Sequence, residues 1–231
     1  MINKLLATAV NLYLRSQVSQ IQDLQVKITG KNRQILKGCL PKVFLTCQNA
    51  IYQGLHLSQI EIEGLDIAFN LSEVLSKQPL RLLEPIVISV NLNLSGQDLQ
   101  ASVNSELLQS GLRDLWQIIL ARDNFPTTIS EINITKIVWY ELTLIEGELY
   151  LLGTYQQDNE LEQELQITLK TRICLGDVHT LSLSKIEIFY NETEIFRLLE
   201  PAKVNLGTEV ILEQLTISSE EIFFSGKITV R

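Results

Sequence analysis

The sequence predicts an α+β fold: a large, curved, mostly antiparallel β-sheet with an N-terminal amphipathic helix and a central helix. Two segments repeat apolar residues every three or four positions, which is the period of a helix with one buried face. Most of the remaining chain alternates apolar and polar residues, a pattern typical of half-buried strands. No Pro- or Ser-rich linker interrupts the 231 residues, so we expect a single domain over residues 1–231.

The first helix is expected over residues 1–22. Its apolar side contains Leu5, Leu6, Leu12 and Tyr13, and two bases, Lys4 and Arg15, flank that side. Such a helix either docks on a membrane surface or packs on the sheet as part of the core, and both interpretations stay open. Thr8 and Asn11 interrupt the apolar stretch, which disfavours a signal peptide.

Four strands are expected in the N-terminal half, over residues 24–29, 42–52, 55–69 and 86–94. The apolar phase slips within residues 55–69, so we expect bulges near Ser58 and Gly64. A short helix or turn is expected over residues 71–76. The C-terminal half is nearly all strand, with segments expected over 131–144, 148–156, 161–174, 179–190, 209–218 and 221–230.

The central helix is expected over residues 95–120. Ser95 has the character of an N-cap, Asp98 lies in the first turn, and Gly111 is a candidate kink or break. A sheet of about nine strands spaced about 4.8 Å apart is about 40 Å wide. Two or three helices barely cover that width, so we expect either that the sheet curls or that another group fills its concave side, with this helix packed on the concave face.

This geometry predicts an apolar groove between the strand over 86–94 and the central helix, because both elements carry an apolar face. The candidate lining residues are Ile88, Val90, Leu92, Val103, Leu107, Leu115 and Ile119. Ligand pockets are usually apolar in this way. The alternative is that these side chains interlock as ordinary core.

The charge distribution is uneven. The net charge is −8, which argues against nucleic acid as a partner. Residues 1–42 hold seven bases and one acid, whereas the rest holds 12 bases and 26 acids. A basic end on an acidic body points to an anionic membrane surface, and we add Lys31, Arg33 and Lys37 to the expected docking residues. The alternative is a solvated basic face.

No catalytic motif is present. The sequence lacks a phosphate-binding glycine loop, a nucleophile elbow and a zinc-protease motif. His56, His179 and Cys174 are the remaining nucleophile or base candidates, and none has a triad partner nearby in sequence. We therefore expect no catalytic residue, no metal and no cofactor. Cys39, Cys47 and Cys174 have neither metal-ligand spacing nor an even count, which favours reduced thiols and a cytoplasmic protein attached peripherally to a membrane, with export left open.

Several segments together resemble the LmeA-like phospholipid-binding family, long described as a domain of unknown function. They are Leu14–Val18, Gln25–Gly30, Asn32–Gly38, Asn49–Leu55, Pro79–Leu83, Ser95–Leu99, Val204–Val210 and Gly226–Val230. The resemblance implies a lipid-binding α+β fold of the curved-sheet, tubular kind. Exported members carry a signal peptide, which residues 1–15 do not convincingly form, so the compartment does not carry over.

Two function classes follow. The first is non-enzymatic binding of a phospholipid or another hydrophobic ligand at a membrane surface. The second is a scaffold or assembly protein with a filled core and no ligand. Lipid that co-purifies with the protein distinguishes the two, because only the first class provides an apolar site for it.

Overall fold

The computed structural model describes residues 2–76, 78–121, 136–156, 164–198 and 200–231, and within these ranges the side chains of all residues except 2–5, 156 and 164. The chain forms two compact units. The first unit comprises residues 1–94, 207–214 and 223–231, and the second comprises 95–206 and 215–222. The single-domain prediction concerns whether these units unfold together, and it stays a prediction. The α+β class with mostly antiparallel, curved sheets is confirmed.

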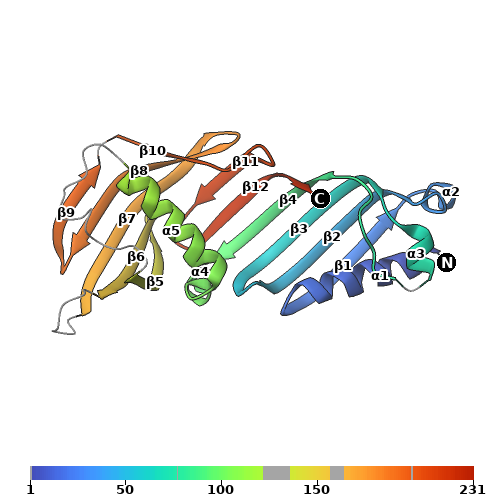
Figure 1. The fold of residues 1–231 in the computed structure, drawn as a ribbon, viewed down its shortest axis with the longest axis horizontal. Coiled ribbons are helices and arrows are strands. Elements are labelled where there is room, and N and C mark those ends of the chain that lie inside the picture. Colours follow the sequence, from blue (N-terminus) through green and yellow to red (C-terminus); the bar gives the residue numbers. More distant parts are fainter. Residues whose placement is uncertain (1, 77, 122–135, 157–163, 199) are drawn as a thin grey trace. The chain divides into compact units, whose positions relative to one another are not determined.

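The strands form two six-stranded sheets in the described part of the chain, where the sequence predicted one. The first has the order β1-β2-β3-β4-β12-β11 (Figure 1). Its strands are β1 (Gln20–Thr29), β2 (Cys39–Tyr52), β3 (Leu55–Ala68), β4 (Ile86–Ser95), β11 (Val210–Ile217) and β12 (Glu221–Val230). The C-terminal β12 therefore pairs beside β4, and β5 to β10, which lie between β4 and β11 in sequence, form the other sheet.

The phase slip expected in β3 is present, but the prediction of bulges near Ser58 and Gly64 is wrong. β3 keeps one continuous register with both β2 and β4. β2 and β3 instead change their buried face together, and Asn49 and Asp66 adopt positive φ at 46° and 49° near these two places. Asn and Asp tolerate this left-handed conformation better than other non-glycine residues. The strands therefore change face without an inserted residue.

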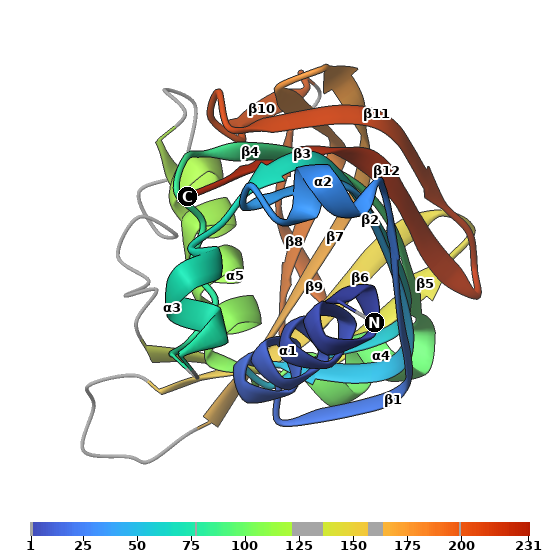
Figure 2. The same ribbon diagram turned by 90° about the vertical axis from the view of Figure 1, so that its right-hand side faces the viewer.

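The N-terminal helix α1 (Ile2–Gln17) packs on the inner face of the first sheet, which curls around it (Figure 2). Leu6 is fully buried in a cluster with Ile35, Phe69 and other core residues, and Leu14 packs on a second cluster that contains Leu45. The helix ends five residues before the expected boundary at residue 22, because β1 already begins at Gln20. Two short helices, α2 (Asn32–Ile35) and α3 (Leu71–Leu75), lie at one end of this sheet.

The second sheet has the order β10-β8-β7-β6-β5, and β9 also pairs with β8. Its strands are β5 (Ile137–Ile145), β6 (Glu148–Gln156), β7 (Glu164–Asp177), β8 (Thr180–Tyr190), β9 (Thr193–Leu198) and β10 (Ala202–Asn205). Residues 131–135 and 161–163, which the sequence placed in strands, lie outside the described residues.

The expected central helix is two helices, α4 (Gly96–Ser102) and α5 (Glu106–Leu120). Ser95 caps α4 as expected, since its hydroxyl accepts from the Asp98 N–H. The break comes before Glu106 and not at Gly111, because the Ser105 hydroxyl accepts from the Leu108 N–H and starts a new helix. On the sheet side, Trp116 of α5 meets Trp139 of β5 edge to face, with ring centroids 5.8 Å apart.

Candidate functional site

An apolar cavity of about 190 Å³ lies in the first unit between α1 and the inner face of the first sheet. Three neighbouring strands supply one wall, α1 supplies another, and the segment between α3 and β4 supplies a third. The lining residues are Val10, Tyr13, Leu14, Leu40, Val43, Leu45, Ile62, Gly64, Ile67, Leu80, Leu82, Ile86, Ile88 and Val230. Only Tyr13 carries a polar side-chain atom, so the cavity suits a hydrophobic ligand.

The strand register produces the floor of this cavity. Val43 of β2 pairs with Gly64 of β3, and Gly64 pairs with Ile88 of β4, so the three positions share one face. A Cβ atom at Gly64 would lie 2.8 Å from the Ile67 Cδ1 atom and 3.5 Å from the Ile88 Cγ2 atom. The absence of a side chain at Gly64 therefore leaves room on this face for the side chains of Ile67 and Ile88, which both line the cavity.

A loop segment closes one side of the cavity. Leu80 and Leu82 point into it, and a buried asparagine holds their backbone in place. The Asn70 Nδ2 atom donates to the Pro79 carbonyl at 3.0 Å, and its Oδ1 atom accepts from the Arg81 N–H at 2.7 Å. Tyr13, which is 41% exposed, lies at the boundary between the cavity and solvent.

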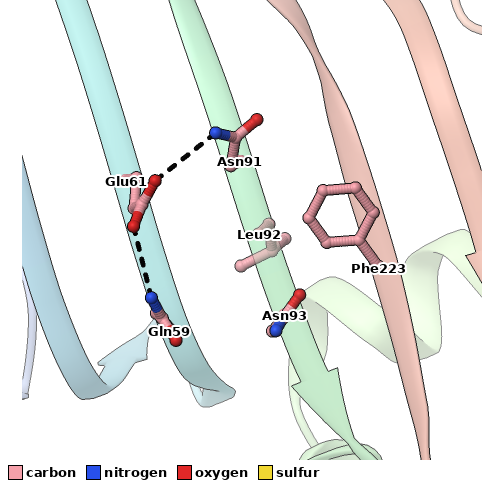
Figure 3. A pocket seen from close by; sticks show the side chains of 6 residues that line it. All are labelled: Gln59, Glu61, Asn91, Leu92, Asn93 and Phe223. Atoms are coloured by element: carbon pink, nitrogen blue, oxygen red, sulfur yellow. Dashed lines mark hydrogen bonds between the residues drawn. The ribbon is translucent and has the colours of Figure 1, made fainter.

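A second, polar pocket of about 110 Å³ lies across β3, β4 and β12 in the first unit (Figure 3). The Glu61 carboxylate accepts from the Gln59 Nε2 atom at 3.3 Å and from the Asn91 Nδ2 atom at 3.4 Å. Leu92, Asn93 and Phe223 complete its lining. The Gln59, Glu61 and Asn91 side chains bond to one another, whereas the buried Asn93 Oδ1 atom has no hydrogen-bond partner among the described residues. This pocket is smaller and more polar than the apolar cavity, so it is the weaker candidate for a hydrophobic ligand.

The residues of the predicted groove are divided between the two units. Ile88, Val90 and Leu92 belong to β4 in the first unit, where Ile88 lines the apolar cavity and Leu92 the polar pocket. The helix residues belong to the second unit: Val103 and Ile119 are buried, Leu115 is half-buried and Leu107 is exposed. The groove between these two sets stays a prediction.

The predicted docking residues lie in α1 and around α2. Leu6 is fully buried in core, whereas Leu12, Tyr13 and Arg15 are exposed on the C-terminal half of α1. The side chains of Lys4 and Leu5 lie outside the described residues. All three bases of the α2 turn are exposed: Lys31, Arg33 and Lys37. Membrane docking by this set stays a prediction.

Sequence reasoning missed most of this cavity, because it placed its groove between β4 and the central helix, whereas α1 lines the cavity. The signal that could have found it was the change from the helical period of α1 to the period-two alternation of β1, β2 and β3. Consecutive elements are usually neighbours in space, which favours α1 as the helix that faces these strands.

The candidate nucleophiles and bases are scattered. His56 belongs to the first unit, and His179 and the exposed Cys174 belong to the second. Burial raises the pKa of the Cys47 thiol, which keeps it protonated and unreactive. The described residues contain no group of three or more His, Cys, Asp or Glu side chains placed to hold a metal ion. Among the described helices, none is long and apolar enough to cross a membrane.

Comparison with known proteins identifies one family. A sequence model described as LmeA-like phospholipid-binding matches residues 1–227, which is nearly the whole chain. No curated protein and no solved structure matches the sequence.

Proposed function

Because the chain belongs to the LmeA-like phospholipid-binding family, we propose that it binds a phospholipid without chemically changing it, at the surface of a membrane. The apolar cavity between α1 and the first sheet carries this proposal. At about 190 Å³ it exceeds the apolar cavity of about 150 Å³ that stays dry and takes up benzene in another protein. It has room for part of one acyl chain.

The lipid is bound with its headgroup outside the cavity. A buried phosphate would need charged or hydrogen-bonding partners, and the lining offers only the Tyr13 hydroxyl. The acyl chain enters the apolar space, and the headgroup stays in water at the boundary near Tyr13. Each methylene removed from water contributes about 0.8 kcal/mol.

The proposed role is binding and not catalysis, because the lining has no chemically reactive pair. Apart from Tyr13, no lining residue has a titratable or nucleophilic side chain. Hydrolysis of a lipid ester requires a positioned nucleophile or an activated water together with a general base.

The membrane-surface part of the proposal rests on the basic turn around α2. Lys31, Arg33 and Lys37 are exposed within seven residues that contain no acid. Each base near an anionic bilayer contributes about 1 kcal/mol. Three bases therefore give reversible attachment, and the acidic remainder of the chain disfavours docking by other faces.

The test of lipid binding is native mass spectrometry of the purified protein and of two variants in β4. Ile88→Trp fills the cavity, whereas Val87→Trp adds the same bulk on the exposed face of the same strand. We expect phospholipid to co-purify with the wild type and Val87→Trp and to be lost from Ile88→Trp. Equal melting temperatures of the variants establish that Ile88→Trp is folded. Wild-type protein without lipid would instead favour the scaffold function.

The test of docking is co-sedimentation with phosphatidylcholine vesicles with and without phosphatidylglycerol. Reversing Lys31, Arg33 and Lys37 to Glu is expected to weaken binding at least about hundredfold, as three charges worth about 1 kcal/mol each imply. Reversing Lys27, Arg113 and Lys203, which are exposed elsewhere, changes the net charge equally. An equal loss in both variants, or binding that does not require the anionic lipid, would contradict docking by the α2 turn.

A further inference from the structure

Three exposed leucines share one local arrangement at the α2–α3 end of the first sheet. Leu36, Leu75 and Leu83 are 60%, 57% and 66% exposed. Each directly follows an apolar residue packed inward, because Ile35 and Val74 are buried in one core cluster and Leu82 packs against it. The preceding residue thus holds the backbone on the core while the leucine points into solvent.

The segments that carry these leucines are joined by backbone hydrogen bonds. The Phe69 N–H donates to the Gly38 carbonyl at 2.9 Å, which connects the α2 turn to the start of α3. The Leu83 N–H donates to the Ala68 carbonyl at 3.0 Å, which connects the segment before β4 to the end of β3. Both views place α2 and α3 at the same end of the first sheet (Figures 1 and 2). We call Leu36, Leu75 and Leu83 the leucine tip.

The charge around the leucine tip is positive on a strongly acidic chain. Residues 31–38 hold Lys31, Arg33 and Lys37 and no acid, and residues 69–76 and 78–85 hold one base and two acids. These described segments therefore have a net charge of +2, although the whole chain has −8. Exposed leucines with bases beside them match the chemistry of an anionic bilayer, which offers hydrocarbon below a layer of phosphates.

We propose that the leucine tip inserts into an anionic lipid bilayer, with the bases of the α2 turn at the level of the phosphates. This inference rests on the proposed membrane-surface function and adds an insertion surface to it. The leucines contribute affinity by leaving water, so attachment at the tip is hydrophobic as well as electrostatic. Such attachment persists in part at salt concentrations that screen the charges.

The tip and the apolar cavity share one segment. Leu80 and Leu82 line the cavity, and Leu83 belongs to the tip. Insertion of Leu83 therefore places a wall of the cavity at the bilayer surface, where a lipid can enter with its acyl chain first.

The first experiment is vesicle co-sedimentation of the Leu36→Ser, Leu75→Ser, Leu83→Ser triple variant. The control replaces the exposed apolar residues Leu65, Val138 and Val178 by Ser. With phosphatidylcholine–phosphatidylglycerol vesicles, the tip variant is expected to lose at least about tenfold in partitioning, the effect of one fully buried leucine. The control is expected to bind as the wild type does. Equal binding by the tip variant and the wild type would overturn the inference.

The second experiment reports insertion directly and requires no loss of stability. In Leu83→Trp, tryptophan emission is expected to shift to shorter wavelength with anionic vesicles and to be quenched by brominated acyl chains. The same change at Leu65 is expected to give neither effect, and the native Trp116 and Trp139 are buried. If Leu83→Trp shows no shift while phospholipid still co-purifies, the tip inference fails and lipid binding stands. The inference would also be overturned if the wild type formed a dimer that did not bind vesicles and the tip variant were a monomer.

Discussion

The Asn70 side chain binds the backbone of Arg81, eleven residues later in the chain. Its Oδ1 atom accepts from the Arg81 N–H at 2.7 Å, and the Asn70 N–H donates to the Arg81 carbonyl at 3.3 Å. The Nδ2 atom adds hydrogen bonds to Pro79 O and to the Glu73 carboxylate. This buried asparagine therefore fixes the segment that carries both the cavity wall and Leu83.

Replacing Asn70 by Ala is expected to reduce the free energy of unfolding by about 3 kcal/mol, because it removes several side-chain hydrogen bonds and leaves buried backbone groups unpaired. Urea unfolding measures this change. Asn91→Ala is the matched control, since Asn91 is exposed and donates one long hydrogen bond to Glu61; its effect is expected to stay within about 0.5 kcal/mol. Similar losses in both variants would contradict the role given to Asn70.

Much of the fold followed from periodicity, and the departures have local causes. Period-two alternation placed β2, β3 and β4 within three residues of their observed bounds. β9 and β10 were missed because both are short. β9 follows a turn at Asn191, and β10 directly follows Pro201. The division into two sheets depends on which strand pairs with β4, and its partner β12 is over a hundred residues away in sequence. Such long-range pairing leaves no local signal.

The candidate site was less predictable than the fold. Ile88 was identified because β4 has the clearest alternation, but its cavity partners on α1 depend on which helix covers which strands. The basic turn at Lys31, Arg33 and Lys37 was visible in the sequence as an acid-free run. The exposure of Leu36, Leu75 and Leu83 could not be predicted from the sequence. Each leucine directly follows Ile, Val or Leu, and the sequence does not show which member of such a pair points inward.

Two glycine-to-alanine changes are expected to act in opposite directions. Gly111 lies within α5, and a Cβ atom there would meet nothing within 4 Å. Gly111→Ala is therefore expected to stabilise the protein by about 0.5–1 kcal/mol, since Ala restricts the unfolded chain and favours helix. Gly226 of β12 is the contrasting site, because its Cβ would lie 2.3 Å from the Ile211 carbonyl oxygen. Gly226→Ala is expected to cost at least about 1 kcal/mol. Thermal unfolding of both variants tests this pair, and stabilisation by both would refute the packing at Gly226.

The ion pairs of Glu148 are expected to make stability pH-dependent. The Lys185 ammonium and the Arg172 guanidinium lie 2.9 Å and 3.1 Å from its Oε1 atom and lower the pKa of this carboxyl. A carboxyl whose pKa is lower in the folded state contributes stability above its unfolded pKa, near 4.3, and loses it as the pH falls through the folded value.

Glu148→Gln is therefore expected to lower the free energy of unfolding at neutral pH by about 1 kcal/mol, a modest effect because both cationic partners are partly exposed. The difference from the wild type is expected to shrink as the pH falls below about 4.3. Urea unfolding at several pH values measures it. Glu213→Gln, at the exposed pair with Lys227, is the control and is expected to change little. If the difference in unfolding free energy between Glu148→Gln and the wild type grew as the pH fell, the lowered pKa of Glu148 would be contradicted.

The two units are expected to unfold together, as a single domain would. The chain passes between them four times, and three of the four boundaries fall within strands, namely β4, β11 and β12. Opening one unit would therefore remove the ends of strands that belong to the other. Because strand hydrogen bonds form cooperatively along a pair, we expect one transition in urea.

Native residues provide a separate probe for each unit. Trp116 and Trp139 are buried in the second unit, and Cys47 is buried in the first. In a protein with Cys39→Ser and Cys174→Ser, tryptophan emission reports the second unit, and reaction of Cys47 with a thiol reagent reports the first. Coincident urea midpoints are expected. A protein that retains only Cys174 is the control, since this exposed thiol is expected to react without urea. If Cys47 became reactive well before or after the emission change, the units would be independent domains, since each probe would then follow its own unfolding equilibrium.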